Sequence, residues 1–303
     1  MMRWMTLLTF VGMVLSVAMV VLSAYIRLSD SGVDCQPWPG CFQSSFLSDE
    51  RPGIAIDEGD THQSLRIAHR LMASAFGMLM VLIFTITAWT SRRQPGRIVV
   101  PGLALIATIV LAVVGMSTPD LAHPLVTTIN LSVGMLLAAM MYAYLLSLVG
   151  KLAFGHVATL ITLVLLYSTI VSGAWVSGNF AAGACNDVLL CSLPDDLSNA
   201  FDPDKILLIE EGVIIPDGLE TAILAVHQYG GLLTFLMMVA VTIRLGKGSP
   251  RRAMIPAGLT LALMIVIGLE QSGQQLMLAS LHNGLSLLLL LVLVHQYFNW
   301  EKS

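Results

Sequence analysis

Eight long apolar runs decide what this chain of 303 residues can fold into. Each run is long enough to cross a bilayer, which takes roughly 20 residues of helix. Backbone polar groups in a bilayer must be paired within the spanning segment, so helices are expected throughout. The runs cover residues 4–26, 64–90, 98–116, 124–149, 154–176, 220–245, 253–270 and 274–298. We expect the first run to be a retained anchor, because no small-residue cleavage site ends it.

Composition agrees with an all-α polytopic membrane protein in contact with membrane lipid. Hydrophobic residues make up 56% of the chain and charged residues 11%, which is far more apolar than a soluble domain. The formal net charge of −4 is spread over acidic loops, so nucleic acid is excluded as a partner.

Basic residues gather in two short connections and predict the orientation. The connections 91–97 and 244–252 contain Lys and Arg but no acid, which is typical of the cytoplasmic side. Both termini are then expected in the cytoplasm. The two long acidic loops, with all four cysteines, are expected on the outer face.

The two halves of the sequence repeat each other. Landmarks recur in the same order 150 to 158 positions later. The pairs are Cys35 with Cys185, Cys41 with Cys191, His69 with His227, Gly115 with Gly268, and Asn130 with His282. Because each unit holds an even number of spans, both enter the membrane the same way round. We therefore predict two tandem pseudo-symmetric four-helix bundles, residues 1–150 and 151–303.

The four cysteines form two pairs of identical C-x5-C spacing in loops expected to face an oxidising compartment. Disulfides persist there, so structural bridges are expected within each pair. Reversible dithiol chemistry is the alternative. A zinc site is less favoured, since neither loop offers a histidine at the usual spacing.

His227 and His282 each lie about two turns inside a long apolar run. An imidazole at such depth needs a partner, and ionisable groups there are usually functional. Two histidines at similar depth on different helices are typical of axial ligands to one heme iron. A hydrogen bond to a neighbouring helix is the alternative for each.

The first half carries a different set at the equivalent places. His69 is a candidate iron ligand for a second heme, whereas Asn130 is no strong iron ligand. Arg66 and Arg70 flank His69 and suit a heme propionate, or they extend toward lipid headgroups. His62 and His123 are further candidate ligands, each seven residues before His69 or Asn130.

Two motifs resemble the heme A synthase family. The segment RLSDSGVDCQPWPGC, residues 27–41, is similar to the first-loop pattern R-L-T-x-x-G-x-x-C-x-x-W-P-x-C of that family. Ala68-His69-Arg70 resembles the first histidine motif, and the second cysteine pair, His227 and His282 follow in matching order. The resemblance covers nearly the whole chain.

The resemblance implies a function and its cofactors. It implies that the C-terminal bundle holds heme B between His227 and His282, and that the N-terminal bundle receives heme O. The heme O methyl group would be oxidised to a formyl group through successive hydroxylations, giving heme A for cytochrome oxidase assembly. Cys35 and Cys41 would pass electrons or assist heme transfer. A bacterial inner membrane is expected, with heme O synthase and oxidase assembly factors as partners; a homo-oligomer stays open.

Two positions depart from the family pattern, and both lie in the substrate half. Arg66 stands where the family has a glutamate implicated in catalysis, and Asn130 stands where it has a histidine. A heme with one axial ligand keeps an open iron face that suits oxygen chemistry. Two other functions stay open: a non-catalytic heme-binding assembly factor, carrier or sensor of the same fold, and a membrane thiol–disulfide or electron-transfer protein.

Overall fold

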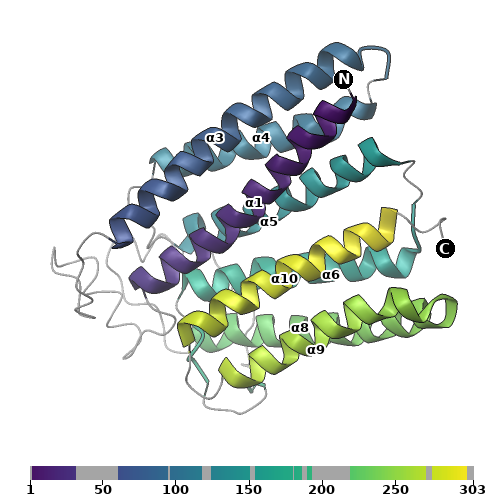
Figure 1. Ribbon diagram of the computed structural model, residues 1–303. Coiled ribbons are helices and arrows are strands. Elements are labelled where there is room, and N and C mark those ends of the chain that lie inside the picture. Colours follow the sequence, from purple (N-terminus) through teal and green to yellow (C-terminus); the bar gives the residue numbers. More distant parts are fainter. Residues whose placement is uncertain are drawn as a thin grey trace.

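The protein was analysed as a computed structural model, in which the described residues form eight α-helices (Figure 1). The described residues are 2–31, 61–94, 96–117, 124–150, 154–179, 181–185, 190–192, 219–270 and 275–298. The helices are α1 (Met2–Ser31), α3 (Thr61–Thr90), α4 (Gly96–Ser117), α5 (Pro124–Val149), α6 (Val157–Gly178), α8 (Leu219–Gly248), α9 (Pro250–Glu270) and α10 (Gln275–Phe298).

The predicted all-α membrane architecture is confirmed. All eight helices are long and apolar enough to span a bilayer, and they coincide with the eight predicted runs. α5 begins at Pro124, a residue that suits the first helical position because its missing N–H would have no intrahelical partner. α1 and α3 extend a turn or so beyond their apolar runs, since helical hydrogen bonding continues past the hydrocarbon layer.

The helices pack as two connected groups (Figure 1). In the first group, α1 and α4 each pack against both α3 and α5. In the second, α6 and α9 each pack against both α8 and α10. The groups meet where α5 contacts α6 and where α10 contacts α1 and α5. This pattern agrees with the sequence repeat, while the domain boundary at residue 150 stays a prediction.

The interior follows from these contacts. The largest buried cluster lies between the groups and includes Val20, Met135, Ile170, Met238 and Leu290, which come from five different helices. α4 and α9 lie at the outside, with only 11% of each apolar window buried, so their exposed aliphatic side chains suit lipid contact.

Proline positions add to the repeat. Pro101 lies inside α4 and Pro256 lies inside α9, near the start of each helix. Membrane helices tolerate proline because neighbouring groups satisfy the freed carbonyl. Equivalent prolines in the third helix of each group therefore extend the correspondence between the halves.

Candidate functional site

His227 on α8 and His282 on α10 face each other across the second helical group. Their ring centroids are 6.3 Å apart, and the ring planes are tilted by 33°. Both residues lie two to three turns from the helix starts, so the two rings sit near the same end of the bundle. Two imidazoles predicted from separate apolar runs are thus brought together by the fold.

Each ring is held through Nδ1 by a different kind of partner. The Ser172 hydroxyl of α6 lies 3.1 Å from Nδ1 of His227. A carboxylate oxygen of Glu270, the last residue of α9, lies 3.1 Å from Nδ1 of His282. A hydrogen bond at one imidazole nitrogen fixes the ring and leaves Nε2 for a ligand. One ring therefore has a neutral partner and the other an acidic one.

Gly173 on α6 brings backbone against the His227 ring. A methyl group added at its Cα would lie 2.8 Å from Cε1 of His227 and 3.5 Å from its Nε2. Separations this short do not occur between real carbon atoms, so only glycine lets the ring keep its position. One turn away, the Thr169 and Thr234 hydroxyls join α6 to α8 at 2.8 Å.

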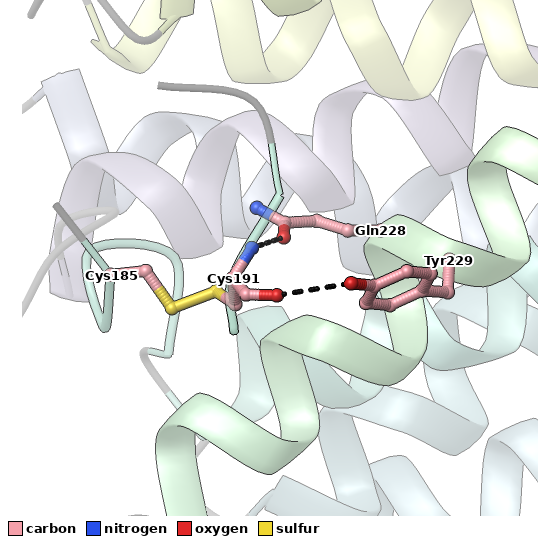
Figure 2. The surroundings of a disulfide bond; sticks show 4 residues. All are labelled: Cys185, Cys191, Gln228 and Tyr229. Atoms are coloured by element: carbon pink, nitrogen blue, oxygen red, sulfur yellow. Dashed lines mark hydrogen bonds between the residues drawn. A yellow bond between two sulfur atoms is a disulfide. The ribbon is translucent and has the colours of Figure 1, made fainter. Parts of the chain in front are cut away.

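A disulfide loop is attached to the two residues that follow the same histidine (Figure 2). Cys185 and Cys191 form a disulfide with their Cα atoms 5.7 Å apart. The Cys191 N–H donates to the Gln228 side-chain oxygen at 2.7 Å, and the Tyr229 hydroxyl donates to the Cys191 carbonyl at 3.3 Å. Gln228 and Tyr229 directly follow His227, so the loop fastens the helix segment that carries the ring. The predicted second disulfide is present.

The whole chain is similar to known proteins of one family. The family of cytochrome oxidase assembly proteins (COX15-CtaA) matches residues 6–294. This chain belongs to that family. A relative from Shewanella oneidensis, a heme A synthase, is 27% identical over 327 aligned positions, which cover 99% of this chain and 98% of that protein. The family assignment predicted from the first-loop and histidine motifs is confirmed.

The structure describes only part of the first-half residues that the family pattern singles out. His69 is half-buried on α3 and Asn130 is half-buried on α5, in the helices that correspond to α8 and α10. Arg66 lies on α3, but its side chain is outside the described part, as is that of His62. Arg70 is exposed. The proposed roles of these residues stay predictions.

Two further histidines lie near helix ends, away from the facing pair. His156 is the N-cap of α6, and its Nδ1 accepts from the Ala158 N–H at 3.1 Å. His295 lies near the end of α10, with its Nδ1 2.9 Å from the Tyr142 hydroxyl. These contacts give both histidines structural roles near the ends of their helices. Cys35, Cys41 and His123 lie outside the described residues.

Sequence reasoning missed the partners that orient the two rings. Glu270 is the acid that ends α9, and an ionisable residue at the end of an apolar run was a usable signal. Nothing in the sequence around Gly173 indicates that its backbone meets a histidine ring. The sequence does not mark Ser172 as a partner of His227, because serines are common in membrane helices.

Proposed function

We propose that this protein is a heme A synthase, which oxidises the methyl group of heme O to a formyl group. Heme B would be its resident cofactor, held between His227 and His282. The observation that carries the proposal is the facing pair of half-buried imidazoles with both Nδ1 atoms engaged. Family membership and the heme A synthase relative over 99% of the chain support the reaction.

The facing histidines fit a heme iron. Two imidazole nitrogens each about 2 Å from one metal ion leave their ring centres roughly 6 Å apart, and the observed separation is 6.3 Å. Neutral imidazole is a common axial ligand, and bound heme supplies one-electron redox chemistry. His227 and His282 would hold the iron, Ser172 and Glu270 would orient the rings, and Gly173 would keep the first ring in place.

The two halves have separate tasks in this proposal. The first half would receive heme O between α3 and α5, with His69 as the iron ligand and Asn130 opposite. The asparagine leaves one face without a strong protein ligand, which keeps it open for the oxidation. Substrate and cofactor then occupy corresponding places in the repeated units.

We also propose an orientation in a bacterial inner membrane. Figure 1 places the start of α1, the end of α10, the α3–α4 connection and the α8–α9 connection at one end of the bundle. That end carries Arg92, Arg93 and Arg97 and also Arg244, Lys247, Arg251 and Arg252. Basic connections remain in the cytoplasm, so the disulfide and both histidines would lie toward the outer face.

Extraction of the bound hemes tests the function. Protein expressed with a supply of heme O should yield heme A as well as heme B, identified by chromatography and mass. His69→Ala should remove heme A from the extract and leave the heme B spectrum unchanged, because the two sites are in different halves. Intact, folded wild-type protein that yields heme B but no heme A would show that the chain is not a synthase.

The Glu270 carboxylate should lower the reduction potential of the bound heme. A carboxylate bonded to Nδ1 makes imidazole a more basic ligand and favours ferric iron. Glu270→Gln is therefore expected to raise the midpoint potential by several tens of millivolts, roughly one tenfold change in the redox equilibrium. A spectroelectrochemical titration measures this change.

The matched control for Glu270→Gln is Ser172→Ala, which removes the neutral partner of His227. Its potential should change less, since no charge is lost. If the midpoint potential of the heme in Glu270→Gln were equal to or below that of the wild type, the role given to the carboxylate would be contradicted.

A further inference from the structure

Arg27 is a buried cation near the end of α1. Its side chain is 7% exposed, and neither terminal guanidinium nitrogen has a hydrogen-bond partner among the described residues. A guanidinium stays charged in proteins, and an unpaired buried charge is costly. Charged residues at membrane depth are usually paired or functional. Arg27 therefore needs an anion.

A small cavity adjoins this guanidinium between α1 and α5. It is lined by Ser23, Ala24, Arg27, Thr127, Asn130 and Leu131. Its polar walls are the guanidinium and the Ser23, Thr127 and Asn130 side chains, all of which can donate hydrogen bonds. No acidic side chain of the described residues lines it. The lining thus suits a small anionic group that accepts several hydrogen bonds.

The cavity lies at the first-half counterpart of the His227–His282 site. The repeat pairs Ser23 with Gly173, whose backbone meets His227, and pairs Asn130 with His282. At the place of Arg27, the second half has the uncharged Ser177. The buried charge is therefore a feature of the first half alone, next to the residue that replaces an iron ligand.

We propose that Arg27 binds a carboxylate of the substrate, a heme O propionate, in this cavity. This inference rests on the proposed function, because it places heme O in the first half. The planar guanidinium presents paired N–H groups that match both oxygens of a carboxylate, and such charge-assisted pairs are the strong ones. The cavity takes the carboxylate, while the porphyrin ring lies toward His69.

Esterification of the substrate tests the pairing. Purified protein carrying heme B is titrated with heme O and with its dimethyl ester, which lacks the propionate charges. Wild-type protein should bind the free acid roughly 10- to 100-fold more tightly, the usual effect of a hydrogen bond to a charged group. Arg27→Gln should lose most of this preference, because only the second propionate then distinguishes the free acid from the ester.

Arg93→Gln is the matched control, because Arg93 is exposed at the opposite end of the bundle. It should keep the full preference for the free acid. The heme B spectrum reports whether each variant is folded. If Arg27→Gln does not accumulate, Arg27→Lys serves instead: it keeps the charge without the planar fork, and its preference should fall several-fold below that of the wild type.

The outcomes separate the two proposals. A wild-type protein that takes up neither porphyrin contradicts the proposed function, since the first half then has no heme site. A wild type that binds both forms equally, or an Arg27 variant with the full wild-type preference, overturns the role of Arg27 alone. Full wild-type preference in an Arg27 variant would place the anion partner of Arg27 elsewhere in the chain.

Discussion

Purified His282→Ala protein is expected to lack the low-spin heme spectrum that we expect of the wild type. His282 and His227 face each other with ring centroids 6.3 Å apart, so each would supply one of two axial ligands. Loss of either ligand leaves the iron with a weak or absent sixth partner, and heme affinity should fall by more than about tenfold. Absorbance and electron paramagnetic resonance spectra of the purified variants measure both changes, and His227→Ala should behave alike.

A second histidine of the same helix provides the control. His295 lies near the other end of α10, where its Nδ1 meets the Tyr142 hydroxyl. His295→Ala should keep the wild-type spectrum and heme content. Imidazole added to His282→Gly should restore a low-spin spectrum, because it can fill the space of the lost ring. An unchanged spectrum in His282→Ala would place the heme elsewhere.

Gly173→Ala should lower the heme content of an otherwise folded protein. The new methyl group would lie 2.8 Å from Cε1 of His227, so the ring or α6 has to move. The ring cannot move without losing its Ser172 contact and its position opposite His282. Overpacking of this kind costs about 1–3 kcal/mol, which corresponds to a roughly 5- to 150-fold loss of heme affinity. Heme-to-protein ratios after purification measure the effect.

Gly268→Ala is the matched control on α9. No atom lies within 4 Å of the place that its methyl group would occupy, so heme content should equal that of the wild type. Equal heme content in Gly173→Ala and Gly268→Ala would mean that the His227 ring has room to move. In that case the close approach of α6 would have no part in ligand positioning.

Much of the fold could be predicted because hydropathy is a local property and a bilayer requires a fixed length. The eight spans, the start of α5 at Pro124 and the family followed from residues close together in the sequence. Similar depth in two apolar runs paired His227 with His282, and the repeat placed His69 and Asn130 at the corresponding positions of the first half. The second disulfide was predicted for a similar reason, because six residues separate its cysteines.

The rest of the site could not be predicted, because it depends on how each helix is rotated against its neighbours. Ser172 is 55 residues from His227, and Glu270 is separated from His282 by the end of one helix and the start of the next. α8 is apolar on nearly all sides, so its sequence does not say which face meets α6. Arg27 likewise gave no sign that it is buried against α5.

The sequence by itself determined that this protein is an eight-helix member of its family with one intact histidine pair and one altered counterpart. Only the tertiary structure decided that the two rings face each other, which groups hold their Nδ1 atoms, and that Arg27 lies beside Asn130 with no partner for its terminal nitrogens among the described residues. The physical reason is that the bilayer selects apolar segments, whereas side-chain packing between helices selects their rotation and contacts.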